Sequence, residues 1–192
     1  MDALSAAAFG IVLAACAGLR AFLPVFSASL AAWTLHVPLP QNLEWLARPE
    51  TVLAFGIATL IEILGDKVPL VDHALDSIQL FTKPGLAVLA ATPFLYQLSP
   101  QYAIGIGIVL GAPLALGVHS AKATARVGST AATGGIGNPI LSVVEDVAAI
   151  GSIALAFLAP VVALVLLAVM LFLLVRFAIR IRKRTRRQAA SG

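Results

Sequence analysis

Long apolar stretches separated by short polar connections make up most of the chain. The stretches cover residues 3–33, 51–64, 85–98, 102–118 and 140–179. A membrane span needs about 20 mainly apolar residues, so the last stretch, with Pro160 near its middle, fits two spans that turn at the proline. The first stretch is long for one span and is interrupted by Arg20 and Pro24. The pattern predicts an all-α integral membrane protein, a compact bundle of about six transmembrane helices, and leaves five open.

Composition supports the same class of protein. The chain is 60% hydrophobic and 11% charged, whereas a soluble domain is about 45–50% apolar and about 25% charged. This contrast excludes a soluble globular protein and a disordered tail, and a single cysteine, Cys16, excludes a disulfide scaffold.

The net charge of +4 combines two opposite parts of the chain. Seven of the 13 basic residues lie in the last 17 positions, which leaves residues 1–175 with a net charge of −3. We therefore predict one multi-pass domain over residues 1–179 and a basic tail over 180–192 that faces the cytoplasm, because basic flanks stay on that side. The lipid bilayer is the expected partner, and the tail suits anionic lipid headgroups. Nucleic acid is not expected as a partner, and a homo-oligomer is left open.

Six spans would place both termini on the cytoplasmic side, together with the connections 66–83 and 119–138. The first connection carries paired acids and a lysine: Glu62, Asp66, Lys67, Asp72 and Asp76. Each acid pair is four residues apart and so shares one helical face. Such carboxylates could bind a hard cation or relay protons. The alternative is a solvated helix whose acids pair with Lys67 and Lys83.

Arg20 lies too deep in the first apolar stretch to be an ordinary flanking residue. An unpaired arginine near the middle of a membrane costs at least about 2.5–3.5 kcal/mol, so we expect it to pair with an acid or face a wet cavity. The expected partners are Glu62 and Glu145. The alternative is a salt bridge that only locks helices together.

The second polar connection is rich in glycine and small hydroxyl residues. Its candidate site residues are Lys122, Arg126, Ser129, Thr130, Thr133, Gly134, Gly135 and Asn138, followed by Glu145 and Asp146. Asn138 is expected to cap a helix whose first position is Pro139, because both residues favour those places. Such a start could bind an anion, and the alternative is a tight interhelical turn. Because adjacent acids face different directions, at most one of Glu145 and Asp146 is expected to enter a shared cavity.

Each half of the chain thus has one arginine-bearing helix and a later helix with paired acids. This similarity suggests a degenerate internal repeat with broken or re-entrant segments around Gly65–Pro69 and Gly134–Pro139, as in some transporters. Sequence motifs of zinc proteases, nucleophilic hydrolases, P-loops and dinucleotide-binding enzymes are absent. We therefore expect no enzyme activity and no cofactor, and leave open whether the acids bind a metal ion.

Three blocks in combination resemble one family of small bacterial integral membrane proteins, known as domain of unknown function 4126. They are 18–24, which reads GLRAFLP, the segment 62–76, and the segment 122–146 with its TGGIGNP motif. The resemblance covers almost the whole chain and implies a single multi-pass domain in a bacterial inner membrane. It implies no activity.

The residues themselves predict a small transporter or channel for a cation or a proton-coupled solute. Glu62 and Glu145 would carry the ion, and Arg20 and Arg126 would be counter-charges, because a cavity of net negative charge attracts cations. A second hypothesis is a transporter of an anion or a lipid phosphate. A third is a structural subunit of a membrane complex, in which the polar residues only pin helices together.

Overall fold

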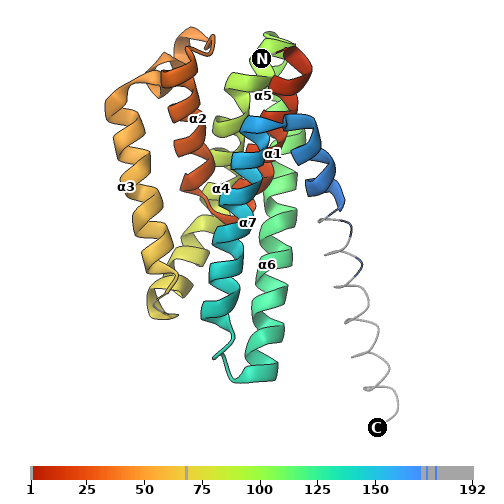
Figure 1. Cartoon of the computed structure of the whole chain (residues 1–192). Coiled ribbons are helices and arrows are strands. Elements are labelled where there is room, and N and C mark those ends of the chain that lie inside the picture. The colour runs from red at the N-terminus through yellow and green to blue at the C-terminus, as the bar shows by residue number, and fades with distance from the viewer. Residues whose placement is uncertain (1, 68, 170–171, 173–175, 177–192) are drawn as a thin grey trace.

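The structure is a computed structural model that describes residues 2–67, 69–169, 172 and 176, without the side chains of residues 69–77. Every regular element in this part is helical (Figure 1), which confirms the predicted all-α class. In chain order the elements are α1 (Ala3–Leu19), α2 (Phe22–Leu35), the 3₁₀ helix η1 (Gln41–Ala47), α3 (Pro49–Gly65), α4 (Pro69–Leu98), α5 (Ala103–Ile106), the π-helical η2 (Gly107–Gly111), α6 (Ala112–Thr133) and α7 (Asn138–Leu158). A further helix covers Pro160–Val169.

The first two helices form a hairpin whose tip lies inside the molecule. The backbone of Arg20 is extended, with φ −131° and ψ 121°, so α1 ends at Leu19 and α2 begins at Phe22. Figure 1 shows α1 descending from the N-terminal end to mid-height and α2 returning upward. Pro24 lies in the first turn of α2, where its missing N–H is tolerated. The first apolar stretch, expected as one interrupted span, is therefore two short helices that return the chain to the end where it started.

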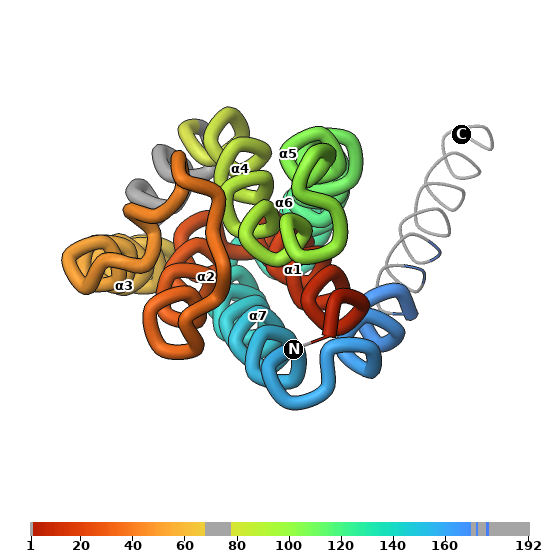
Figure 2. Tube along the Cα trace, turned by 90° about the horizontal axis from the view of Figure 1, so that it is seen from above, coloured from red at the N-terminus to blue at the C-terminus, as the bar shows by residue number. Residues whose placement is uncertain are grey.

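The remaining helices run alternately down and up the molecule (Figure 1). Within the described residues three of them, Ile78–Leu98, Ala103–Thr133 and Asn138–Leu158, are long and apolar enough to cross a membrane. A helix of this kind with about 20 residues measures about 30 Å, the thickness of the hydrocarbon core. After α7 the chain leaves the helical conformation at Ala159 and turns back (Figure 2), which confirms the turn expected at Pro160.

The outer faces of α3 and α7 are apolar, as a lipid environment requires. Leu60 and Leu64 on α3, and Val143 and Val147 on α7, are between 51% and 67% exposed. Contiguous exposed apolar surface is uncommon on soluble monomers and is typical of membrane contact. The fold therefore suits a membrane protein, and polar side chains on these helices have to turn inward.

Helix α1 runs through the centre of the bundle, with α4, α6 and α7 around it (Figure 2). Small residues allow the close approach of these helices. A Cβ atom added to Gly18 would lie 2.5 Å from the Cβ atom of Val118 and closer still to the backbone oxygen of Ala115. This contact between α1 and α6 fixes the hairpin tip beside the polar part of α6.

Candidate functional site

Arg20 lies at the hairpin tip and is completely buried. Its two terminal guanidinium nitrogens point to different helices: Nη1 pairs with Asp66, the residue that follows α3, and Nη2 pairs with Asp146 on α7. Nη2 also donates to the hydroxyl of Ser142, at 3.2 Å. Because Arg20 itself is not helical, its side chain can extend between these elements. The prediction that this arginine is paired is confirmed, but the expected partners, Glu62 and Glu145, were wrong.

Asp66 is the acid on which the cationic side chains converge. One of its oxygens, Oδ2, pairs with Arg20 and lies 3.6 Å from Nζ of Lys122 and 3.4 Å from Nη2 of Arg126. The other oxygen, Oδ1, is buried and has no hydrogen-bond partner among the described residues. Lys122 and Arg126 are one turn apart on α6, which brings both to the same face.

Glu145 and Asp146 both enter this arrangement, although at most one was expected to do so. Glu145 turns toward α6, where its Oε2 lies 3.0 Å from Nη2 of Arg126 and 3.2 Å from Nζ of Lys122. Asp146 turns toward the hairpin tip and pairs with Arg20 and, at 2.7 Å, with Nζ of Lys67. Neighbouring residues on a helix do face different directions, but cationic partners lie on both sides of α7.

These side chains form one charge network, defined here as Arg20, Asp66, Lys67, Lys122, Arg126, Glu145 and Asp146. The exposure of its side chains increases from one end of the network to the other. The side chains of Arg20, Asp66 and Lys122 are at most 1% exposed, whereas Asp146 is 13% and Lys67 is 35% exposed. The network therefore reaches the surface beside Lys67 and ends in the interior at the hairpin tip.

Glu62 lies on α3, one turn before Asp66, and binds backbone N–H groups instead of Arg20, its expected partner. Its carboxylate accepts the backbone N–H groups of Ala21, at 2.7 Å, and Phe22, at 3.0 Å. Gln79 on α4 donates a third hydrogen bond, at 2.7 Å. The first N–H groups of a helix have no partner within the helix and carry a partial positive charge. Glu62 therefore caps α2 from outside and holds the hairpin tip to α3.

A second buried polar contact was missed by the sequence reasoning. Nζ of Lys83 on α4 lies 2.9 Å from Nδ1 of His119 on α6, and both residues are buried. Helical spacing carries the signal: Lys83 is four residues after Gln79, and His119 is three residues before Lys122. Lys83 therefore lies on the same face of α4 as Gln79, which binds Glu62, and His119 lies on the same face of α6 as Lys122.

The glycine-rich connection makes its contacts within itself. Gly134 and Gly135 have positive φ angles, which glycine adopts at little cost. Thr133 accepts the N–H of Gly137, and the side-chain amide of Asn138 donates to Thr130. Asn138 is the first residue of α7 and does not cap it, so the expected cap was wrong and Gly137 has that place. Ser129 lies in the last turns of α6. Thr130 donates to the backbone oxygen of Arg126, at 2.9 Å, but among the described residues the ion pairs of the charge network involve none of these candidates.

The side chains of Asp72 and Asp76 lie outside the described residues. Within the described part, no three side chains of His, Cys, Asp or Glu are arranged to hold a metal ion.

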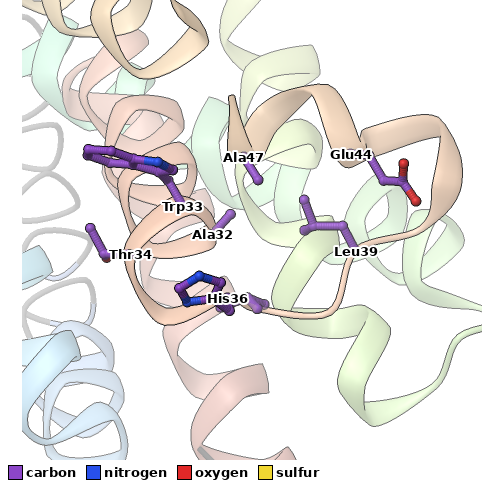
Figure 3. Close-up of a pocket in the computed structure, with 8 residues that line it drawn as sticks. Ala32, Trp33, Thr34, His36, Leu39, Glu44 and Ala47 are labelled. Atoms are coloured by element: carbon purple, nitrogen blue, oxygen red, sulfur yellow. The ribbon is translucent and has the colours of Figure 1, made fainter. Parts of the chain in front are cut away.

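An open pocket of about 670 Å³ lies at the other end of the molecule, where α2 meets η1 (Figure 3). Trp33, His36 and Glu44 supply its larger polar side chains, and Figure 3 shows Glu44 on the far side of the pocket from the other two. His36 has a φ of 51° because it ends α2 in the left-handed conformation, a common helix terminus. This pocket lacks the buried opposing charges of the network, which remains the stronger candidate site.

Comparison with known proteins gives a family and nothing more specific. No curated protein and no solved structure is significantly similar to the chain. One family model matches residues 7–180, which include most of the hairpin, the charge network and the connection before α7. The chain therefore belongs to the family that its sequence blocks resemble, the one described as Domain of unknown function (DUF4126).

Proposed function

We propose that the protein is a small proton-coupled solute transporter of the bacterial inner membrane, and that the charge network is its proton and substrate site. In this arrangement α3, α4, the continuous run from α5 to α6, α7 and the stretch that begins at Pro160 cross the bilayer. The α1–α2 hairpin enters from the outer side, and the basic tail faces the cytoplasm, as the positive-inside rule requires.

The observation that carries this proposal is the position of Arg20. It is fully buried at a break between two helices and binds carboxylates that belong to two other elements. Buried charges in a membrane are costly and usually functional. Transporters commonly place their sites where discontinuous helices meet, because helix ends there face ions and substrates.

The network offers a direct way to couple a proton to a conformational change. A proton that binds Asp66 or Asp146 removes the negative charge that holds Arg20. Loss of one such contact weakens the link between the hairpin tip and its neighbours, and two arrangements of the same charges can then exchange. Because Lys67 and Asp146 are partly exposed, protons would enter from that side of the molecule.

The proposal can be tested in proteoliposomes that contain a pH-sensitive dye. Sodium, choline, sulfate and lactate are added outside in turn, and the change of internal pH is compared with that of empty vesicles. We expect at least one solute to move protons through the wild type, and Asp66→Asn and Glu145→Gln to abolish this movement. Glu50→Gln, an exposed acid at the start of α3, is the matched control and should behave as the wild type.

A purely structural role predicts another outcome. If the network only pins helices together, no solute moves protons and the variants lose thermal stability. A transport site loses flux in variants that still fold, whatever their stability, so proton movement by the wild type separates the two roles. Absence of proton movement with every solute would overturn the proposed function.

A further inference from the structure

Asp66 occupies the centre of a binding arrangement that suits an external anion. Cationic groups from Arg20, Lys122 and Arg126 all lie within 3.6 Å of its one oxygen, Oδ2. Two of these groups are guanidinium groups, whose planar donors match carboxylate, sulfate and phosphate oxygens. The same three cations also contact the other acids of the network, because Arg20 pairs with Asp146, and Lys122 and Arg126 lie 3.2 and 3.0 Å from Glu145.

The atoms around this contact have unused hydrogen-bonding capacity. Oδ1 of Asp66 and Nε of Arg20 are both buried and have no hydrogen-bond partner among the described residues. Buried polar atoms are nearly always bonded, so an unbonded acceptor and donor in one contact need an explanation. A molecule with oxygen atoms that replaced the Asp66 carboxylate could satisfy the guanidinium group more fully.

We propose that the transported solute is a small oxyanion, a carboxylate or a phosphate-like ion, which takes the place of Asp66 between Arg20, Lys122 and Arg126. This inference rests on the proposed function and names its substrate class. When the anion binds, Asp66 loses its cationic partners and takes up one proton from the aqueous side. A monovalent anion such as lactate and the proton together add no net charge to the buried site, and for a divalent anion such as sulfate the proton halves the added charge.

Enclosure of the site favours a solute over a lipid headgroup. The side chains of Asp66, Lys122 and Arg20 are at most 1% exposed, so a ligand there would be surrounded by the bundle. Other charged groups also face these cations: Glu145 through Lys122 and Arg126, Asp146 and Lys67 beside Arg20, Glu62 one turn away, and the Lys83–His119 pair on α4 and α6. Asp72 and Asp76 belong to the same polar stretch and lie outside the described side chains.

The test is binding of sulfate and of lactate to the purified full chain in detergent, measured by titration calorimetry at several pH values. Both probes stay ionised at neutral and mildly acidic pH, so a pH dependence must come from the protein. If one proton accompanies each anion, the wild type should bind about tenfold more tightly for each unit that the pH falls. Chloride at equal ionic strength should not compete. A parallel titration with micelles that contain phosphatidylglycerol shows whether a lipid headgroup is the ligand instead, which would overturn the proposal.

Variants separate this site from general attraction of anions. Asp66→Asn should bind either probe at least tenfold more tightly than the wild type at neutral pH, and without the pH dependence. Arg126→Gln should lose binding, whereas Arg48→Gln, an exposed arginine before α3, should bind as the wild type does. If Asp66→Asn does not fold, the pH dependence of the wild type and the loss in Arg126→Gln still decide the question.

Failure of this inference can be told apart from failure of the proposed function. If sodium or choline moves protons but neither sulfate nor lactate binds, the protein is a transporter whose substrate is not an oxyanion. If an oxyanion binds with the expected pH dependence but no solute moves protons, the anion site is supported and the transport function is rejected. Binding that does not change with pH, or that is equal in Arg126→Gln, overturns the inference.

Discussion

Replacement of Arg20 by methionine should destabilise the protein more than any other single change in the charge network. Methionine has a similar length and no charge, so the space is largely filled while two ion pairs, to Asp66 and Asp146, are lost. Breaking a buried ion pair by removing one partner costs about 3–5 kcal/mol, because the other charge stays buried without compensation.

The expected cost lies at the lower end of that range. Asp66 keeps Lys122 and Arg126 at 3.6 and 3.4 Å, and Asp146 keeps Lys67 at 2.7 Å and is partly exposed. We therefore expect a loss of about 3 kcal/mol, which lowers the unfolding temperature by about 6–12 °C in a chain of this size. The measurement is thermal unfolding in detergent, followed by circular dichroism or by a dye that reports exposed thiols.

Two further variants test the reasoning behind this number. If the cost comes from an uncompensated carboxylate, the double variant Arg20→Met/Asp146→Asn should be more stable than the sum of the two single losses predicts, by about 1–3 kcal/mol. Arg48→Met, which removes an exposed arginine, should change stability by no more than about 0.5 kcal/mol. An unfolding temperature of Arg20→Met within about 2 °C of the wild type, roughly the effect of less than 1 kcal/mol, would refute the reasoning.

Three other changes follow from the packing and the hairpin tip. Gly18→Ala should strongly reduce the yield of folded protein, because the added Cβ atom meets the backbone of α6. Gly117 has open space around it, so Gly117→Ala should be neutral. Size-exclusion profiles of the two variants make the comparison. Glu62→Gln should lower stability by about 1–3 kcal/mol, since an amide places a donor against an N–H group of α2, and equal unfolding temperatures would contradict its capping role. Cys16, which is 1% exposed, should react with a maleimide only after denaturation, and rapid labelling of the native protein would contradict the central place of α1.

Much of the architecture could be predicted because it depends on local patterns. Apolar runs of membrane length predicted the helices, Pro160 predicted the turn after α7, and the depth of Arg20 predicted that it is paired. Each of these follows from residues close together in the sequence.

The pairing of charges could not be predicted in the same way. Glu62 near the end of α3 and Asp66 just after it lie on the same side of the helix, and a shift of one turn, about 5.4 Å, decides which of them meets Arg20. That choice depends on where the hairpin tip ends, and hence on the packing of α1 against α6. Lys83 and His119 were missed because they are 36 positions apart in the sequence and meet only when α4 packs beside α6.

The sequence positions of its partners also determine when Arg20 can be paired during synthesis of the protein. Ser142 and Asp146 belong to α7, and Ser142 follows Arg20 by 122 positions. At about 5–20 residues per second, the ribosome needs about 6–24 s to make that part of the chain. During this time the N-terminal hairpin exists with a charged tip whose partners on α7 have not been made. The pairing of Arg20 at the hairpin tip is therefore complete only after α7 has been made. A polypeptide truncated before α7 would present an incompletely paired arginine to the membrane proteases of the cell.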